Sequence, residues 1–240
     1  MGGDSRNRLI IIGAGGHGKV VADIAKRKGY EDIVFLDNDT SVKECFGYSV
    51  IGPDTRDREL EGDLFVAVGN PFIRMKLMER NRERSFPTLI HPDAVIADDT
   101  EIGGGTVVMA GTVINPGTKI GMGCIVNTSA SVDHDCIVGD YSHISVGAHL
   151  CGTVKIGNRV WVGAGATVSN NVNICPDITI GAGAVVVHNI EEKGIYIGVP
   201  AKRSNKSHMT EGGRALRNKY DRIMYQPLSG FLQKADRRAV

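Results

Sequence analysis

Two histidines, one of them beside an aspartate, are well suited to acid–base chemistry in this sequence. His134 is followed directly by Asp135, and His143 comes nine residues later. An imidazole titrates near neutral pH and can act as a general base, while an adjacent carboxylate can hold its tautomer and stabilise the imidazolium. We therefore take His134 as a candidate base and Asp135 as its partner. The alternative is a histidine that is merely solvated at the surface.

The residues around these histidines repeat every six positions. Every sixth residue from Ile96 to Val186 is aliphatic, sixteen positions in all, and the residue two before each is small or apolar. This period is typical of a hexapeptide β-helix, in which three hexads form one triangular coil and both positions point inward. The sequence thus predicts a left-handed parallel β-helix over residues 93–203.

The register places both histidines on the outside of the β-helix. His134 is fifth in its hexad, at a corner, and His143 is second in its hexad. Within one chain a full face of roughly 15 Å separates them, so both can serve one reaction only if they come from different chains. A cyclic trimer meets this condition, which predicts active sites between the subunits of a homotrimer. His149 also points outward and is interpreted as a surface or interface residue.

The three outward-pointing histidines also allow an alternative function, in which they bind a metal ion. Some trimeric hexapeptide β-helices are carbonic anhydrases that hold zinc between chains by three histidines. Asp135 has no role in that scheme, and neither has the α/β domain described next. We therefore expect no metal.

A second candidate site lies in a glycine-rich turn near the start of the chain. Gly13, Gly15 and Gly18 form a G-x-G-x-x-G pattern between an expected strand, 9–12, and an expected helix, 19–28. Such a turn suits a phosphate at the helix N-terminus, with Asp37 of the next strand end near a ribose or base. The structural alternative is a tight turn that only packs the helix on the strand.

The strands and helices around this turn predict a half-Rossmann α/β domain over residues 8–92. Its length suits one nucleotide diphosphate better than NAD. His17, inside the turn, is expected to contact the ligand. Gly69 and Asn70 follow a third strand, 63–68, at the same edge of the sheet and are expected to close the pocket.

Charge and composition limit the partners and the compartment that we expect for this protein. The 240 residues carry 28 basic and 27 acidic side chains, which gives no general attraction to nucleic acid or membranes. The early apolar run at 9–12 is too short for a signal sequence or a membrane span. The five cysteines are most simply free thiols in a reducing compartment. We expect a cytoplasmic protein with no nucleic-acid partner and no membrane insertion.

The motifs occur in the same order in one known family. They are the turn at 13–18, Phe35-Leu36-Asp37, Val68-Gly69-Asn70, the segment 134–143 and Gly198-Val199-Pro200-Ala201-Lys202. Over residues 8–203 the chain resembles the acetyltransferases that modify UDP-4-amino sugars in bacterial glycan synthesis (PglD-like). It is also similar to the related sialic acid O-acetyltransferases (NeuD-like).

The resemblance implies transfer of acetyl from acetyl-CoA to the amino group of a UDP-linked 4-amino sugar. His134 matches the base that deprotonates the acceptor, Asp135 the acid that raises its basicity, and His143 a contact of the acetyl thioester. The backbone near Ala164 and Ala182 falls where the pantetheine arm lies. The nucleotide-sugar pocket matches Ala14, Gly15, Gly16, His17, Asp37 and Asn38, the last replacing a commoner second Asp.

Two other functions stay open at this point. O-acetylation of sialic acid or another sugar hydroxyl would use the same base. A non-enzymatic nucleotide-sugar-binding trimer would not bind acetyl-CoA. Residues 204–240 extend beyond the resemblance as a basic tail, which is either a solvated extension or a docking segment for CoA phosphates or a partner.

Overall fold

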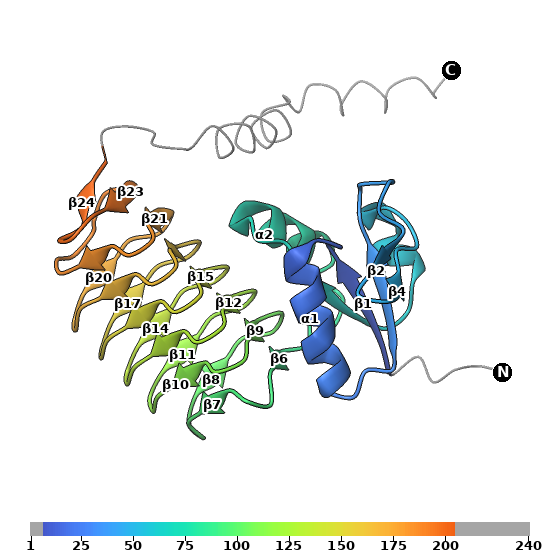
Figure 1. Cartoon of the computed structure of the whole chain (residues 1–240), viewed down its shortest axis with the longest axis horizontal. Coiled ribbons are helices and arrows are strands. Elements are labelled where there is room, and N and C mark those ends of the chain that lie inside the picture. Colours follow the sequence, from blue (N-terminus) through green and yellow to red (C-terminus); the bar gives the residue numbers. More distant parts are fainter. Residues whose placement is uncertain (1–6, 205–240) are drawn as a thin grey trace, which may run out of the picture. The chain divides into compact units, whose positions relative to one another are not determined.

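A computed structural model describes residues 7–204 of the chain and shows an α/β part followed by a parallel β-helix (Figure 1). Residues up to Arg203 form one compact unit. The basic tail predicted above lies outside the described residues. Neither of the two α-helices in the described segment is long and apolar enough to span a membrane.

The α/β part has a three-stranded parallel sheet in the order β2-β1-β5. The buried aliphatic run at 9–12 becomes the central strand, as expected for a strand covered on both faces. The elements in chain order are β1 (Arg8–Ile12), α1 (Gly16–Arg27), β2 (Asp32–Leu36), β3 (Glu44–Cys45), β4 (Tyr48–Ser49), the 3-10 helix η2 (Asp54–Glu59), β5 (Asp63–Val66) and α2 (Pro71–Arg80). The three predicted strands and the helix predicted after the glycine-rich turn are present, and the small β3–β4 hairpin and η2 are additional.

The β-helix consists mainly of two-residue strands spaced mostly six residues apart, with longer strands at β21 and β23. They are β6 (Leu89–Ile90), β7 (Val95–Ile96), β8 (Glu101–Ile102), β9 (Val107–Val108), β10 (Val113–Ile114), β11 (Lys119–Ile120), β12 (Ile125–Val126), β13 (Ser131–Val132), β14 (Ile137–Val138), β15 (His143–Ile144), β16 (His149–Leu150), β17 (Lys155–Ile156), β18 (Trp161–Val162), β19 (Thr167–Val168), β20 (Asn173–Ile174), β21 (Ile178–Ile180), β22 (Val185–Val186), β23 (Gly194–Ile197) and β24 (Lys202–Arg203).

These strands form three faces. Face 1 contains β7, β10, β13, β16, β19 and β22; face 2 contains β8, β11, β14, β17 and β20; face 3 contains β6, β9, β12, β15, β18, β21, β23 and β24. Every pairing is parallel except that of β23 with β24. Residues 18 apart therefore stand side by side on successive coils, as His143 does with Trp161.

The interior of the β-helix matches the predicted register. The aliphatic positions from Val108 to Val186 are buried, and only Ile96 and Ile102, in the first coil, are partly exposed. Three of the threonines among the small positions are buried too. Thr106, Thr112 and Thr118 each donate a hydroxyl hydrogen bond to a carbonyl 15 residues on, at 2.8, 3.0 and 2.7 Å. Their polar groups are thus satisfied inside an otherwise apolar core.

The α/β part packs against the start of face 3. Leu89, Val107 and Ile125 of face 3 belong to the same buried cluster as Val21 and Ile24 of α1. Outward residues of this face are normally solvated, so their burial shows that the sheet of the α/β part and the coils share one apolar junction.

The assignment of inward and outward positions in the β-helix predicts how two substitutions change the free energy of unfolding. Ile144 on β15 is fully buried at an inward position, whereas Ile137 on β14, the preceding strand in the chain, points outward and is 44% exposed. Ile144→Ala should lower the free energy of unfolding by about 2–5 kcal/mol because it leaves a cavity. Ile137→Ala should change it by less than about 0.5 kcal/mol. Urea denaturation of both variants checks this, and similar losses in the two would contradict the assigned register.

Candidate active site

The glycine-rich turn joins β1 to α1 and leaves one side open. An added Cβ at Gly13 would lie 2.7 Å from the carbonyl oxygen of Ala67, and one at Gly18 would collide with the carbonyl of Gly13. These two glycines are required by close packing. An added Cβ at Gly15 or Gly16 would meet nothing within 4 Å. Packing therefore does not require these two glycines, which border open space at the start of α1, where backbone N–H groups favour an anion.

Asp37 and Asn70 hold the loops at this edge of the sheet. Asp37 accepts hydrogen bonds from the backbone N–H of Ala14, at 2.7 Å, and of Asp39, at 2.8 Å. The side-chain oxygen of Asn70 caps α2 by accepting from the N–H of Phe72 and of Ile73. Both predicted pocket residues thus also have a structural role.

Asn38 and Gly69 complete the predicted pocket edge. The Asn38 amide donates to the Asp54 carboxylate at 2.8 Å, and its oxygen accepts from the Asp54 N–H at 3.1 Å. The carbonyl of Gly69 accepts a hydrogen bond from Arg74. The carboxyl ends of β1, β2 and β5 meet here, which is where open α/β sheets bind ligands.

His134 and Asp135 form a hydrogen-bonded pair at the corner between β13 and β14. His134 Nδ1 lies 2.8 Å from the Asp135 carboxylate, and both side chains are exposed. The carboxylate accepts the hydrogen bond, so Nδ1 carries the proton and Nε2 keeps a free lone pair. The hydrogen bond to Asp135 raises the pKa of His134, and the charge of Asp133 adds to this effect. The arrangement is that of an oriented general base.

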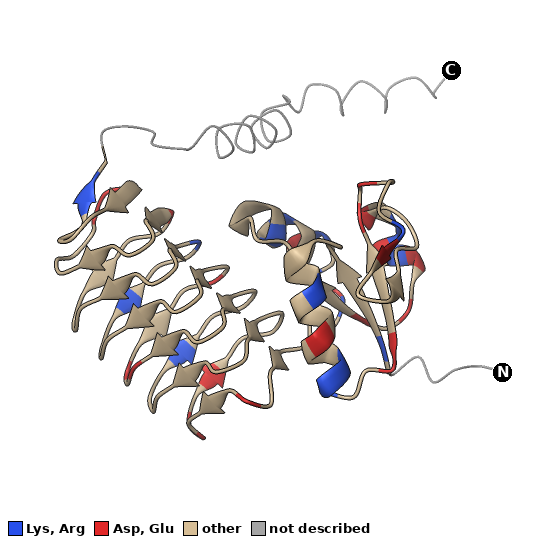
Figure 2. Cartoon of the chain, in the orientation of Figure 1, with Lys and Arg blue, Asp and Glu red and all other residues tan. Residues whose placement is uncertain are grey.

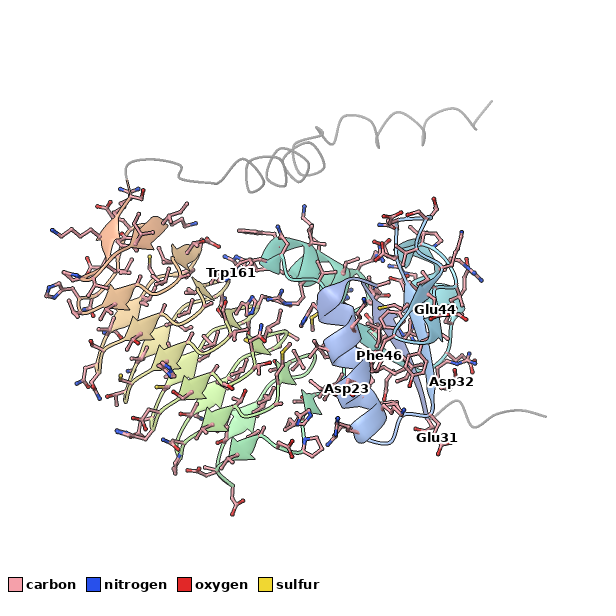
Figure 3. All side chains as sticks on the ribbon, viewed as in Figure 1. Asp23, Glu31, Asp32, Glu44, Phe46 and Trp161 are labelled. Atoms are coloured by element: carbon pink, nitrogen blue, oxygen red, sulfur yellow. The ribbon has the colours of Figure 1, made fainter. Side chains whose placement is uncertain are left out.

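His143 lies on face 3 among polar and aromatic side chains. Its Nε2 is 3.1 Å from the amide nitrogen of Asn127, and its ring centroid is 5.0 Å from that of Trp161. Trp161 projects from β18 (Figure 3) and donates to Ser145 at 2.9 Å. The Asn127 oxygen accepts from the N–H of Thr128, so its NH₂ group must face His143. His143 therefore accepts at Nε2 and carries its proton on Nδ1.

His143, His17 and Arg74 interact electrostatically at the junction of the two parts. Burial, with the charge of Arg74 as a smaller cause, lowers the pKa of His143 to about 3 and that of His17 to about 4. Both imidazoles are thus neutral at physiological pH. His143 Nδ1 and His17 Nε2 are buried and have no hydrogen-bond partner within the described part of the chain.

Arg74 joins the two parts through backbone carbonyls. It is 1% exposed, and from α2 it donates to Gly123 at 2.6 Å and Tyr141 at 2.7 Å in the β-helix. It also donates to the carbonyls of Val68 and Gly69 in the α/β part. Burial lowers its pKa to about 10, so the guanidinium is charged at neutral pH. One side chain therefore fixes the pocket edge relative to the coil that carries His143.

The structure brings some predicted site residues together and leaves others apart. His17 of the turn lies near His143, whereas His134 lies at the corner between faces 1 and 2, away from face 3. Ala164 and Ala182 occupy successive coils at the corner after face 3, where the Gly183 N–H donates to the Ala164 carbonyl at 2.9 Å. His149 points outward on face 1 and pairs with Ser131 at 2.8 Å.

Three residues of this region were not singled out from the sequence. Trp161 is 18 residues after His143, so the coil period could have revealed it as the stacked neighbour. Asn127 lies on the preceding coil and could have been found in the same way. Arg74 carries no such signal, because its role depends on how α2 meets the β-helix.

Comparison with known proteins gives consistent matches. Residues 8–81 match the family model of the PglD N-terminal domain. UDP-N-acetylbacillosamine N-acetyltransferase of Bacillus subtilis (strain 168) is 36% identical over 110 residues, 42% of this chain and 51% of that protein. The chain thus spans about half the length of this curated relative.

Two solved structures match over nearly their whole length. The acetyltransferase domain of PglB from Neisseria gonorrhoeae FA1090, in complex with acetyl coenzyme A, is 43% identical with a TM-score of 0.80, over 83% of this chain and 100% of that one. PerB from Caulobacter crescentus, in complex with CoA and GDP-perosamine, is 37% identical with a TM-score of 0.77, over 82% and 97%.

The fold and these matches define a class, the hexapeptide-repeat acetyltransferases that carry an N-terminal α/β domain. Within this class the chain belongs to the PglD-like family of sugar N-acetyltransferases, since the N-terminal family model agrees with structural matches that cover nearly the whole of each relative.

The two buried imidazoles make stability depend on pH. Their pKa values lie below the ordinary 6.5 in the folded chain, so below pH 6.5 the unfolded chain binds protons that the folded chain does not take up until about pH 4 and 3. The free energy of unfolding should therefore fall as pH decreases from 6.5 to 4, by up to about 1.4 kcal/mol per pH unit for each histidine.

His143→Gln tests this dependence by urea denaturation at pH 6.5 and 5. The variant should lose less stability over this range than the unaltered protein, because one of the two imidazoles is gone. The raised pKa of His134 acts in the opposite direction but is common to both proteins. Equal losses in both proteins would contradict a buried neutral His143.

Proposed function

We propose that this protein transfers the acetyl group of acetyl-CoA to the amino group of a nucleotide-linked 4-amino sugar, with UDP as the favoured nucleotide. The observation that carries the proposal is the His134–Asp135 pair, whose Nε2 is free to accept a proton at an exposed corner of the β-helix. Family membership supports the same chemistry, since PglB was solved with acetyl coenzyme A and PerB with CoA and GDP-perosamine.

The acceptor occupies the open side of the glycine-rich turn. The space beside Gly15 and Gly16, at the start of α1, suits the pyrophosphate of a sugar nucleotide. Asp37 and Asn38 lie at the end of β2, where the ribose and base would be contacted. Asp37 holds Ala14 in place, so it also shapes the turn that receives the phosphates.

His143 steadies the acetyl thioester. Its Nδ1–H has no partner within residues 7–204. A buried donor left unpaired costs about 1–3 kcal/mol, which supports a ligand oxygen as its acceptor. Because burial keeps His143 neutral, it serves as a hydrogen-bond donor to the developing oxyanion and not as an acid. The exposed backbone at Ala164 and Ala182 provides the path for the pantetheine arm.

His134 takes the proton in the transfer step. The amine nitrogen attacks the thioester carbon, the new C–N bond forms, and the C–S bond breaks with its electron pair leaving on sulfur. His134 Nε2 accepts the amine proton and passes it to the departing thiolate, while Asp135 stabilises the imidazolium. His143 Nδ1–H stabilises the oxyanion of the tetrahedral intermediate.

A homotrimer completes this site. His134 lies between faces 1 and 2, while His143 lies on face 3, so the two must come from neighbouring chains. Face 1 is the interface we favour, because its outward residues include no Lys, Arg, Asp or Glu. They are Val95, Val113, Ser131, His149, Thr167 and Val185. Face 2 instead carries Glu101, Lys119 and Lys155 on β8, β11 and β17 (Figure 2).

The assay that tests the proposal follows CoA release from acetyl-CoA with a panel of acceptors. The panel contains a UDP-4-amino sugar, a GDP-4-amino sugar and sialic acid. We expect release with the UDP-linked amino sugar. Release with the GDP sugar alone would change the assigned nucleotide from UDP to GDP and keep N-acetylation as the assigned reaction. Release with sialic acid alone would change the assigned reaction from N-acetylation to O-acetylation. Failure to bind acetyl-CoA at all would favour a nucleotide-sugar-binding scaffold.

The same assay tests the base. His134→Ala should lower turnover by about 10²–10⁴-fold with the preferred acceptor. The oligomeric state, measured by light scattering, should not change, because His134 lies at the corner between faces 1 and 2 and is not one of the outward strand residues of face 1 that form the favoured interface. Near-normal turnover in this variant would exclude His134 as the base.

A further inference from the structure

The residue opposite His134 on the next coil is a glycine. Gly152 follows His134 by 18 residues, so the two occupy the same corner of successive coils. The regular backbone hydrogen bonds between successive coils are present at both residues. The Thr153 N–H donates to the His134 carbonyl at 2.8 Å, and the Asn171 N–H donates to the Gly152 carbonyl at 3.1 Å. A side chain at position 152 would therefore stand directly beside the imidazole.

We propose that Gly152 is a positioning residue for the base: its missing side chain provides the space in which the His134 imidazole lies while Asp135 holds it. This inference rests on the proposed function of His134. An added Cβ at Gly152 would lie 2.5 Å from His134 Nε2 and 2.7 Å from Cε1. These distances are well below van der Waals contact, so the ring must move.

The backbone itself does not require glycine at this position. Gly152 is not among the residues with positive φ, and the three atoms nearest to its added Cβ all belong to the His134 ring. An alanine would therefore fit the main chain but not the imidazole. The requirement for glycine comes from the catalytic side chain.

Asp135 has a corresponding neighbour on the preceding coil. An added Cβ at Gly117 would lie 2.5 Å from the Asp135 carboxylate oxygen. Gly117 also has a φ of +74°, so substitution there would strain the backbone as well. The base and its partner are thus flanked by one glycine on each side, and of these two Gly152 is the informative one to change.

An alanine at position 152 should misplace the base without unfolding the protein. The imidazole would rotate away, which breaks its 2.8 Å contact with Asp135 or covers Nε2. We expect Gly152→Ala to lower kcat by about 10–100-fold, as a misplacement near 1 Å does. The KM for acetyl-CoA should stay the same, because Gly152 is not among the groups assigned to acetyl-CoA, which are His143, Ala164 and Ala182.

Asn170→Ala is the matched control. It lies 18 residues after Gly152, at the same corner one coil further from His134, and is exposed. It should keep normal kcat and KM. A similar loss in both variants would mean that the corner tolerates no change and would overturn the proposal.

The double variant His134→Ala/Gly152→Ala separates positioning from a general structural effect. If Gly152 acts through His134, the double variant should be no slower than His134→Ala alone. Independent, multiplying losses would overturn the proposal.

Thermal unfolding gives a second measurement that does not depend on activity. Removing the imidazole removes the collision, so the Tm lost in Gly152→Ala should be regained in the double variant. If Gly152→Ala does not fold, recovery of folding in the double variant supports the proposal and its absence overturns it. If the unaltered protein acetylates no acceptor, the proposed function fails, while this Tm comparison still tests the contact.

Discussion

The structure depends on one constraint, the six-residue register of the β-helix. An inward aliphatic residue recurs at every sixth position, three hexads close one coil, and each side chain therefore faces the residue 18 positions further on. Hydrogen-bonded pairs at this spacing connect successive coils: Lys119 with Glu101, Asn115 with Asp133, Ser131 with His149, Thr153 with Asn171 and Arg159 with Asp177. The same spacing places Trp161 beside His143 and Gly152 beside His134. Because the core fixes the register, it also fixes which outward residues meet at the site.

The α/β part is joined to this rigid β-helix by a buried charge. Arg74 is held by four carbonyl groups, two on each side of the junction, and no carboxylate is among these partners. Burial, and to a smaller extent the charge of Arg74, keeps His17 and His143 neutral. A neutral imidazole can donate a hydrogen bond to a developing oxyanion, whereas a charged one would be strongly disfavoured at this position. The residue that fixes the geometry of the junction thereby adds to the effect of burial, which is the main reason that the histidines beside it are neutral.

Much of the fold and part of the site were predictable from the sequence. The period of six specified the β-helix, and alternation of strands and helices specified the parallel sheet, because both patterns report directly on burial. The outward positions of His134 and His143 followed from the same register. Arg74 was not predictable, since its partners are backbone carbonyls 49 and 67 residues away that carry no sequence signal. The structural roles of Asp37 and Asn70 were missed for a similar reason: a side chain that binds backbone N–H groups looks the same in a sequence as one that binds a ligand.

In the proposed trimer, each active site combines His134 of one chain with His143 of its neighbour. Complementation between two inactive variants tests it most directly. His134→Ala and His143→Ala chains, each inactive alone, are co-expressed and CoA release by the mixed oligomers is measured. In a randomly mixed trimer about a quarter of the sites receive both histidines intact, so activity should return to about that fraction of normal. Mixed oligomers no more active than either variant alone would show that both residues serve a site within one chain.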